Sequence, residues 1–528
     1  MGGGLMQLVA YGAQDIYLTG NPQITFWKVS YKRHTNFSME SIEQTFNGAA
    51  DWGRKVTCTI SRNGDLISRV YLQTTLPQVT LTSAGQFRWL NWIGHVMIRY
   101  VEIEIGGQRI DRQYGDWMHI WNELTQAAGK KEGYAQMVGN VPRLVQPITN
   151  PGATSPTLNA LPQASTLAFG ECDLTSCMPE TTLYIPLEFW FCRNPGLALP
   201  LIALQYHEVK INLEFREARG CYWATDANFV LPSLKAASLY VDYVYLDTDE
   251  RRRFAQTSHE YLIEQLQFTG DESVNSTANR IKMNFNHPVK ELIWVVQPDS
   301  NVTSADTQAV GGPQWFNYTD SLDYTPLTGT PDSPYGSGLS GPGNTMTAGS
   351  MTQVYYGTSN SVTVADQGFG LGPLPTDTTS GMSNTPATLS NTATVANAAL
   401  ANAFNVGLAS ANWLLDRGQN CVAAAKIQLN GHDRFSERQG SYFNLVQPYQ
   451  HHSNIPATGI NVYSFGLKPE EHQPSGSCNM SRIDNAVLQL HLTPKSVQGS
   501  RSCKVRIYAV NYNVLRIMSG MGGLAYSN

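Results

Sequence analysis

Apolar and polar residues alternate strictly at two distant places in the chain, 101–105 and 425–429, and both stretches run into the same kind of turn. A period of two is typical of a strand with one buried face. The turn pairs Gly106-Gly107 and Asn430-Gly431 supply the positive φ values that two-residue hairpins need. Each stretch then reaches a glycine followed two residues later by an aromatic residue: Gly115 with Trp117, and Gly440 with Tyr442. The pattern predicts one hairpin used twice.

Three other similarities occur in the same order in both halves of the chain. They are Ile42-Glu43-Gln44 with Ile263-Glu264-Gln265 (offset 221), Asn63 with Asn286 (offset 223), and the predicted strands Phe189-Trp190-Phe191 and Tyr463-Ser464-Phe465 (Phe191 with Phe465, offset 274), whereas the hairpins differ by 324. Collinear matches favour one fold repeated with unequal loops over chance hairpins. The changes in offset place 101 extra residues of the second half between 297 and 426, and 50 extra residues of the first half between 117 and 189.

Short alternating segments with Gly and Pro turns recur along the chain and no helical repeat is visible, which predicts an all-β protein of two β-sandwiches or jelly rolls. We expect an N-terminal arm at 1–25 and a first module at 26–246 with a long loop at about 120–180. The second module is expected at 263–528, with a large loop insertion at about 300–412. That insertion contains six Asp but no Lys, Arg or Glu, and it carries several aromatic residues. It is therefore interpreted as an elaborated surface loop, partly strand-forming, that can pack on a neighbour.

A short linker helix is expected at 247–262, where the chain reads L-D-T-D-E-R-R-R-F from residue 246. Asp247 and Asp249 stand four residues before Arg251 and Arg253, which is the favourable order and spacing for helical ion pairs. A phosphate-binding or nucleic-acid-binding role for the three arginines is the alternative. The helical interpretation is favoured by this ion-pair spacing, and such a helix would also fix the angle between the two modules.

The composition limits the possible functions of the 528 residues. Charged residues are 15%, aromatic residues are 10% and the net charge is −5, which fits a large interface-rich β protein and lacks the basic excess of a nucleic-acid-binding protein. The amino terminus does not resemble a signal peptide, and no apolar run reaches the length of a membrane span. The eight scattered cysteines are expected to be reduced thiols.

No catalytic, cofactor-binding or metal-binding residue is predicted. The chain contains no H-E-x-x-H, G-x-S-x-G or Walker-type motif. Cys172 and Cys177 lack a second ligand pair, the adjacent His451 and His452 would point to opposite faces of a strand, and the Glu470-Glu471 pair is interpreted as solvated. Glycosylation sequons stand at five asparagines, whose match to the motif is expected by chance in a chain without a signal peptide: Asn36, Asn275, Asn301, Asn317 and Asn479.

Several longer sequence segments carry a family resemblance that extends from about residue 8 to the end and is weak across 120–180 and 300–412. They include A-Y-G-A-Q-D-I-Y-L-T-G-N-P-Q-I-T-F (10–26), I-S-R-N-G-D-L-I (60–67), E-I-G-G-Q-R-I-D (104–111), P-G-L-A-L-P-L-I-A-L-Q-Y-H-E-V-K (195–210), R-F-A-Q (253–256), H-E-Y-L-I-E-Q-L-Q-F-T-G (259–270), K-I-Q-L-N-G-H-D-R-F (426–435), P-S-G-S-C-N-M-S-R-I-D-N-A (474–486) and N-Y-N-V-L-R-I-M-S-G-M-G-G-L-A-Y (511–526). Together they strongly resemble the major capsid proteins of large icosahedral double-stranded DNA viruses, nearest to those of algal viruses.

The resemblance implies two tandem eight-stranded jelly rolls per chain and a structural, non-enzymatic role without a cofactor. It further implies a homotrimeric capsomer of pseudo-hexagonal outline that contacts neighbouring capsomers, penton proteins and minor capsid proteins. Direct contact with nucleic acid is not implied, and the resemblance is compatible with an internal viral membrane beneath the shell. The expected location is the virion, with synthesis and assembly in the host cytoplasm.

Two other functions remain open from the residues alone. A glycan-binding β protein would use the aromatic residues of 301–412 as a sugar platform, which sugar binding by the isolated chain would support. A jelly-roll enzyme would need a metal, which elemental analysis would detect.

Overall fold

The computed structural model describes residues 3–81, 85–150, 177–323, 418–497 and 501–526. The first half forms two antiparallel four-stranded sheets, with β11 (Leu199–Pro200) added at the edge of β3. One has the order β1 (Phe37–Gln44), β14 (Ala236–Leu246), β3 (Leu66–Leu76), β10 (Thr181–Pro186), and the other β2 (Lys55–Thr59), β12 (Val209–Phe215), β6 (Ile98–Ile105), β7 (Gln108–Tyr114). Their facing apolar side chains form one core, so the first half is a jelly roll.

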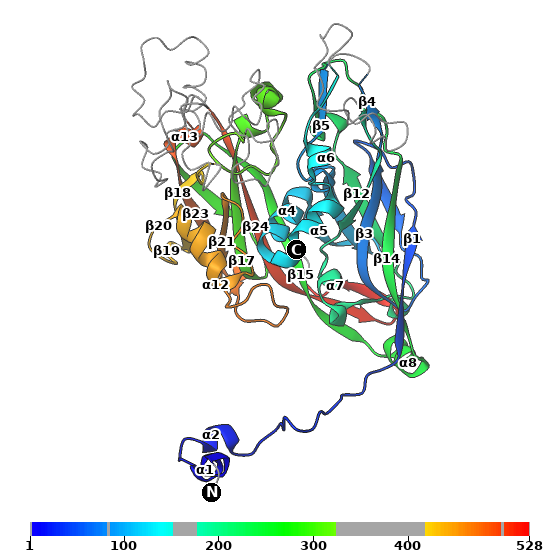
Figure 1. Cartoon of the computed structure of the whole chain (residues 1–528), viewed down its shortest axis with the longest axis vertical. Helices are drawn as coiled ribbons and strands as arrows, with labels where there is room; N and C mark the ends of the chain where they lie inside the picture. The colour runs from blue at the N-terminus through cyan, green and yellow to red at the C-terminus, as the bar shows by residue number, and fades with distance from the viewer. Residues whose placement is uncertain (1–2, 82–84, 151–176, 324–417, 498–500, 527–528) are drawn as a thin grey trace, which may run out of the picture.

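The second half repeats this strand order. Its first sheet runs β15 (His259–Val274), β24 (Cys503–Met518), β17 (Pro288–Pro298), β21 (Ile460–Ser464), and its second runs β16 (Ala278–Met283), β23 (Ala486–Leu492), β18 (Val422–Leu429), β19 (His432–Asp433). The short strand β20 (Arg438–Gln439) also pairs with β18, so β19 and β20 together take the place of β7. The predicted double jelly roll is therefore confirmed, and Figure 1 shows the two rolls side by side.

The strand registers fix which residues of the two rolls correspond. The pairing of β14 with β3 skips Ser68, and the pairing of β24 with β17 skips Lys290. Both bulges imply an offset of 222 between β3 and β17, one less than the sequence suggested. Ile105 and Leu429 each end their strand at the hairpin turn, opposite Val209 and Ala486 of the equivalent neighbouring strands. The two organising hairpins are thus equivalent, as predicted.

The other two sequence similarities outside the hairpins were also wrong in register. Ile42 and Ile263 lie on equivalent strands but not at equivalent positions. Glu43 pairs with Tyr240 of β14, and Phe268 pairs with the corresponding Tyr508 of β24, so the offset between β1 and β15 is 225 rather than 221. Phe191 is not in a strand, because β10 ends at Pro186, which has no amide hydrogen to continue the ladder. Trp190–Arg193 instead forms the short helix α7.

The expected long loop at 120–180 is helical over its first part. The helix α4 (Gly115–Thr125) is followed by α5 (Lys131–Val138) and α6 (Pro142–Val145), and residues 151–176 lie outside the described part. Apolar residues at helical spacing explain α4, as the next subsection describes. Of the expected insertion at 300–412, the part from 324 onward lies outside the described residues. Residues 299–323 contain α9 (Ser304–Thr307) and two short 3-10 helices, η6 (Asp299–Asn301) and η7 (Gln308–Val310).

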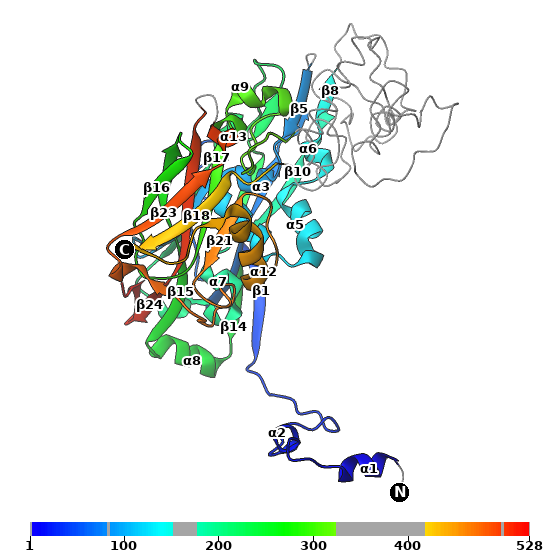
Figure 2. The ribbon, with the colours of Figure 1, turned by 90° about the vertical axis from the view of Figure 1, so that its left-hand side faces the viewer.

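The linker helix is shorter than expected, since α8 spans Thr248–Gln256 and β15 already begins at His259. Asp247 caps the helix by accepting a hydrogen bond from the Thr248 amide, and Arg251 pairs with Asp65 at 3.0 Å. The expected Asp247–Arg251 ion pair is therefore replaced by a contact with the first roll. The chain before β1 forms an arm that leaves the body near α8 and contains α1 (Gly3–Val9) and α2 (Ile16–Thr19), so the arm is longer than residues 1–25 (Figures 1 and 2).

The remaining elements are short. They are α3 (Ile93–Val96), η1 (Ala128–Lys130), η3 (Pro195–Leu197), η4 (Leu201–Ala203), η5 (Ala218–Gly220), η11 (Tyr442–Val446), α12 (Gln447–His451), η12 (Met480–Arg482), α13 (Pro494–Val497), β4 (Val79–Thr80), β5 (Gly85–Trp89), β8 (Ile148–Asn150), β9 (Cys177–Met178), β13 (Tyr222–Ala224), β22 (Cys478–Asn479) and β25 (Met521–Leu524).

Candidate assembly surfaces

The helix α4 belongs to the first roll but packs against the second. Four of its apolar residues, at positions i, i+3, i+4 and i+7, are at most 5% exposed: Trp117, Ile120, Trp121 and Leu124. They share a core cluster with the outer face of the second roll's first sheet, which contributes Ile293, Val295, Ile460, Val462, Tyr508 and Val510. Figure 1 shows α4 between the two rolls. Because burial of this much apolar surface is strongly favourable, the two rolls form one unit.

An ion-pair network accompanies this apolar contact. Asp116, in the first turn of α4, binds Arg506 of β24 at 2.8 Å, and Arg506 also binds Asp271 at 3.0 Å. Burial alone would lower the pKa of Arg506, but Asp116 and Asp271 raise it above its ordinary value. The Arg506 side chain is only 9% exposed, so loss of a carboxylate partner would leave a buried charge poorly compensated.

The second roll reaches back to the first through residues 299–323, which begin the large insertion. The indole nitrogen of Trp315 donates to the Gly220 carbonyl at 2.9 Å, and the Arg216 guanidinium lies 4.1 Å from the centre of the Trp315 ring. Arg88 of β5, which is buried, donates to the Gly311 carbonyl at 3.0 Å. Burial lowers the pKa of Arg88 to about 9. The two rolls therefore exchange contacts in both directions.

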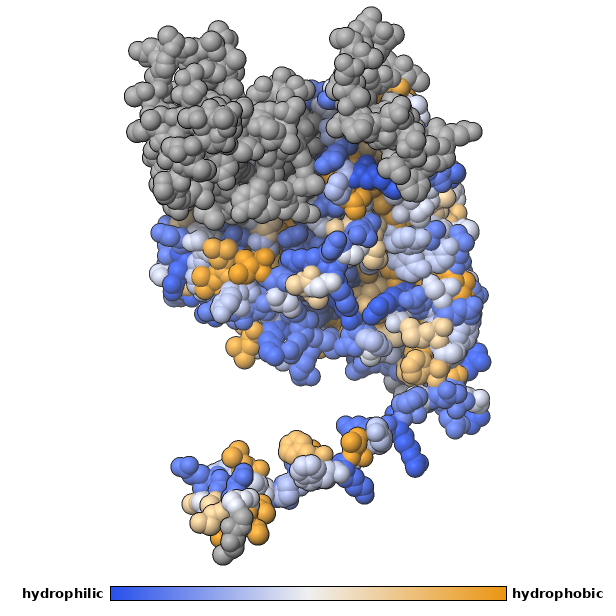
Figure 3. Space-filling model, viewed as in Figure 1, coloured by the Kyte–Doolittle hydropathy of each residue, from blue (hydrophilic) through white to orange (hydrophobic). Residues whose placement is uncertain are grey.

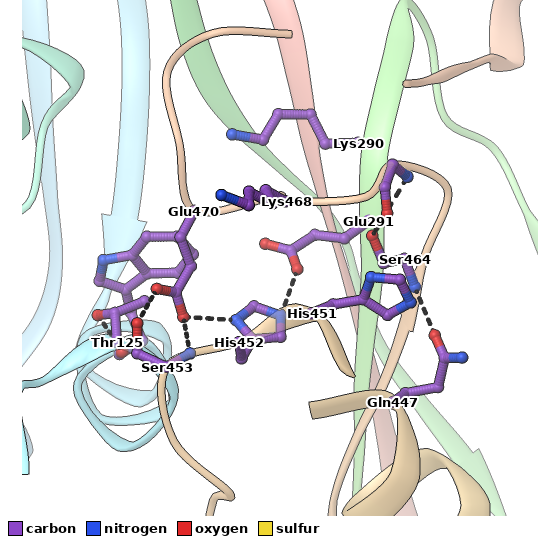
Figure 4. Close-up of polar contacts among 12 residues, drawn as sticks. Thr125, Lys290, Glu291, Gln447, His451, His452, Ser453, Ser464, Lys468 and Glu470 are labelled. Atoms are coloured by element: carbon purple, nitrogen blue, oxygen red, sulfur yellow. Dashed lines mark hydrogen bonds and ion pairs between the residues drawn. The ribbon is translucent and has the colours of Figure 1, made fainter. Parts of the chain in front are cut away.

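Within the second roll, a buried histidine links the end of α12 to strand β17. His452 Nε2 lies 2.8 Å from Glu291 of β17, and Nδ1 lies 2.9 Å from Glu470 (Figure 4). The His452 side chain is fully buried; burial alone would lower its pKa, but the two carboxylates raise it to about 9. Glu470 also accepts a hydrogen bond from the Ser453 amide. The cluster thus fixes the loop that follows α12.

A second buried ion-pair cluster lies beside the His452 cluster, because Lys290 is the neighbour of Glu291 in β17. Lys290 Nζ is 2.6 Å from Glu264, and Arg193 of α7 is 3.1 Å from the same carboxylate. Burial alone would raise the pKa of Glu264, but His472, Lys290 and Arg193 lower it to about 2. Arg193 comes from the first roll and Lys290 from the second, so this pair also crosses the boundary between the rolls.

The structure corrects two sequence-based interpretations. Glu470 is paired with His452 rather than solvated, and sequence reasoning missed this cluster. The available signal was Lys290-Glu291 inside an otherwise apolar strand, since buried charges require partners. Cys177 is disulfide-bonded rather than reduced, with its partner outside the described residues.

The structure shows how far each predicted glycosylation sequon is accessible. Asn301 is 1% exposed and donates to the Asn317 and Thr319 carbonyls, while Asn317 donates to Gln314 and Ser321. Asn36, Asn275 and Asn479 are exposed. Within the described residues no group of three or more His, Cys, Asp or Glu side chains is placed to hold a metal ion. In the same part of the chain no helix is long and apolar enough to span a membrane.

Exposed apolar residues gather on the N-terminal arm. The most exposed are Trp27 at 94%, Tyr17 and Tyr31 at 89%, and Phe26 at 85%. Figure 3 shows hydrophobic patches along the arm. An exposed apolar segment of this kind is typical of a chain that docks on a partner.

Comparison with known proteins identifies the family. Residues 25–247 match the family described as "Major capsid protein N-terminus", and residues 250–523 match "Large eukaryotic DNA virus major capsid protein". The chain is 56% identical to the major capsid protein of Phaeocystis pouchetii virus and 39% identical to that of Paramecium bursaria Chlorella virus 1, with all of each chain covered. A solved structure titled "PBCV-1 virus capsid, quasi-atomic model" is 34% identical with a TM-score of 0.59, over 96% of this chain and 100% of the other.

These matches extend over both rolls and agree with the double jelly roll and with the structural role. The relatives are capsid components rather than enzymes, so the protein is a virion component that associates with other copies of itself in a capsid. The chain therefore belongs to the major capsid proteins of large eukaryotic DNA viruses.

Proposed function

We propose that the protein forms homotrimeric capsomers of pseudo-hexagonal outline, which tile the icosahedral shell of a large double-stranded DNA virus. The observation that carries this proposal is the repeated strand order of the two rolls. Three chains with two similar rolls present six similar wedges, and six-fold outlines suit most positions of an icosahedral lattice. Five-fold vertices would then require a different penton protein.

We further propose that the end of the molecule that carries α8 and the arm faces the interior of the virus. The arm leaves the body at the end that carries α8, whereas β4, β8 and α9 lie at the opposite end (Figures 1 and 2). The exposed apolar residues of the arm suit minor capsid proteins or the surface of an internal viral membrane beneath the shell. Because no contact with nucleic acid is required in this arrangement, a net charge of −5 is acceptable. We also propose that synthesis and assembly take place in the host cytoplasm.

The chain is proposed to act in three parts: the arm before β1, the first roll from Phe37 to Leu246, and the second roll from His259 to Leu524, with α8 as the link. Of the sequons at Asn275, Asn301, Asn317 and Asn479, those at Asn275 and Asn479 are the proposed glycan acceptors, because both side chains are exposed. Asn301 and Asn317 are excluded from this proposal since their amides already donate hydrogen bonds within the fold.

Sedimentation and electron microscopy of the purified full chain test the trimer. We expect a single species of three chains that appears as uniform hexagonal plates. A monomer or dimer at micromolar concentration, without hexagonal particles, would overturn the proposal.

A further inference from the structure

The segment η11–α12 of the second roll occupies the place that α4 has in the first. A methyl group added to Gly115 would collide with the carbonyl oxygen of Ile98, the first residue of β6, and one added to Gly440 would collide with that of Val422, the first residue of β18. The two glycines therefore start equivalent turns, at an offset of 325. At this offset Met118 corresponds to Phe443, and each is buried in the core of its own roll.

The same offset reveals a counterpart of the apolar face that α4 buries against the second roll. Trp117, Ile120, Trp121 and Leu124 correspond to Tyr442, Leu445, Val446 and Tyr449. Leu445 is 47% exposed, Val446 39% and Tyr449 77%. Figures 1 and 2 place α12 on the side of the second roll that is turned away from the first. In the single chain Leu445, Val446 and Tyr449, named here the donor face, are open to solvent, whereas Tyr442 is half-buried.

A counterpart also exists for the sheet face on which α4 lies. The strand registers give offsets of 222 for β3 and β17, 268 for β14 and β24, and 276 for β10 and β21. Ile293, Tyr508 and Ile460, which α4 covers, thus correspond to Tyr71, Tyr240 and Tyr184 on the outer face of the first roll.

These three tyrosines form a ring cluster, named here the tyrosine patch. The rings of Tyr71 and Tyr240 stack with centroids 5.3 Å apart, and that of Tyr184 lies 6.4 Å from Tyr71. Tyr184 is 41% exposed, and the other two are half-buried.

We propose that the donor face of one copy docks on the tyrosine patch of a second copy, as α4 docks on the second roll within each chain. This inference rests on the proposed trimer and names the contact that closes it. Each copy carries one donor face and one patch, so the contact is head-to-tail, and a ring closes when the third copy reaches the first. A two-fold dimer in which two tyrosine patches face each other would leave both donor faces uncovered.

The chemistry of the two surfaces suits a partner of the same kind. Leu445 and Val446 offer apolar side chains, and the tyrosine patch offers flat rings with hydroxyl groups at their edges. Tyrosine is enriched at protein interfaces because its ring buries apolar area while its hydroxyl retains a hydrogen bond. The patch can therefore remain soluble on a free chain and still be buried in a capsomer.

Two double variants of the full chain test the contact. Leu445→Glu with Tyr449→Glu changes the donor face, and Tyr184→Glu with Tyr240→Glu changes the patch. A matched control, Val230→Glu with Tyr206→Glu, changes two residues that are 83% and 75% exposed and lie on neither surface. Sedimentation is measured for each protein, and circular dichroism monitors the fold. We expect trimers for the wild type and the control, and folded monomers for both interface variants.

A mixture of the two interface variants makes the test directional. The patch of the donor-face variant and the donor face of the patch variant are both intact, so one contact can form. The mixture should therefore give dimers of one copy of each at high concentration, without closed trimers. Trimers in both interface variants, or a mixture that stays monomeric, would overturn this inference and leave the trimer itself standing. A wild type that is not trimeric would instead overturn the proposed function.

Discussion

The outer sheet faces of the two rolls share the same strand order, but in the single chain one is covered by a helix and the other is partly exposed. On the second roll, Ile293, Ile460 and Tyr508 lie under α4 and are fully or almost fully buried. On the first roll the corresponding positions hold three tyrosines that a single chain leaves partly exposed. Under the proposed docking between copies, one repeated contact serves two uses. A surface that is covered during folding can be wholly apolar, whereas a surface that is covered only after folding must first be stable in contact with water.

The charges follow the same division. Asp116 and Arg506 form a buried ion pair within the chain, and the corresponding residues are Ser441 and Ser238. Complete desolvation of an ion pair is costly and demands good geometry, which a covalently linked pair of rolls can supply. Serine at both places leaves the proposed contact between copies free of that requirement.

The largest expected effect comes from emptying the contact within the chain. Trp117→Ala removes a side chain that is 1% exposed and packs beside Tyr508, with their ring centres 5.5 Å apart. We expect the free energy of unfolding to fall by about 3–5 kcal/mol, measured by chemical denaturation. Tyr206→Ala, at a position that is 75% exposed, serves as the control and should change it by less than about 0.5 kcal/mol. A loss below about 1 kcal/mol for Trp117→Ala would mean that α4 is not an essential part of the boundary.

The next effect concerns the cluster that holds the end of α12, and hence the donor face. The pKa of His452 is raised from its ordinary value of 6.5 to about 9, so the protonated ring favours the folded chain. This stabilisation is complete below pH 6.5 and is lost as the pH rises through 9. The wild type should therefore lose up to about 3 kcal/mol of unfolding free energy over this range relative to His452→Gln.

His451→Gln is the matched control for this pH dependence. The His451 ring contacts only the Leu467 carbonyl among its described polar partners, and the variant should keep the pH dependence of the wild type. Unfolding measured by denaturant between pH 6 and pH 10 gives both curves. Parallel curves for wild type and His452→Gln would show that the buried cluster does not titrate in this range.

How much of this arrangement the sequence predicts depends on whether the signal is local. The hairpins at Gly106-Gly107 and Asn430-Gly431 were predicted because alternation and turn pairs lie within a few residues of one another. The register of Ile42 against Ile263 was not, because register depends on the neighbouring strands rather than on similar short segments.

The helices and the buried charges show the same limit. The aromatic run at Trp190 and Phe191 was interpreted as a strand, but β10 already ends at Pro186, and both residues are buried from the short helix α7 instead. Glu470 and His452 are separated by 18 residues, and their pairing depends on how a loop folds back on β17. The donor face could be recognised only after α4 was seen against the second roll, because its exposed residues are unremarkable by themselves.

A smaller effect is expected for the ion pair that distinguishes the two contacts. Asp116→Asn removes one carboxylate from Arg506, which keeps Asp271 at 3.0 Å. The unfolding free energy should fall by about 1–3 kcal/mol. Ser441→Ala changes the corresponding position of the second roll and should be nearly neutral. Equal losses for the two variants would contradict the view that only the contact within the chain relies on charge.

The smallest effect on the isolated chain is expected at Tyr449, and it gives the sharpest test of the comparison. Tyr449 corresponds to Leu124, but it is 77% exposed whereas Leu124 is fully buried. Tyr449→Ala should therefore change the unfolding free energy of the monomer by less than about 0.5 kcal/mol, whereas Leu124→Ala should lower it by about 2–5 kcal/mol. For trimer formation we expect the opposite order, with the larger loss for Tyr449→Ala, because Tyr449 is buried only when a second copy docks. If Tyr449→Ala forms trimers at the same protein concentration as the wild type, the equivalence of the two contacts does not extend to their energetics.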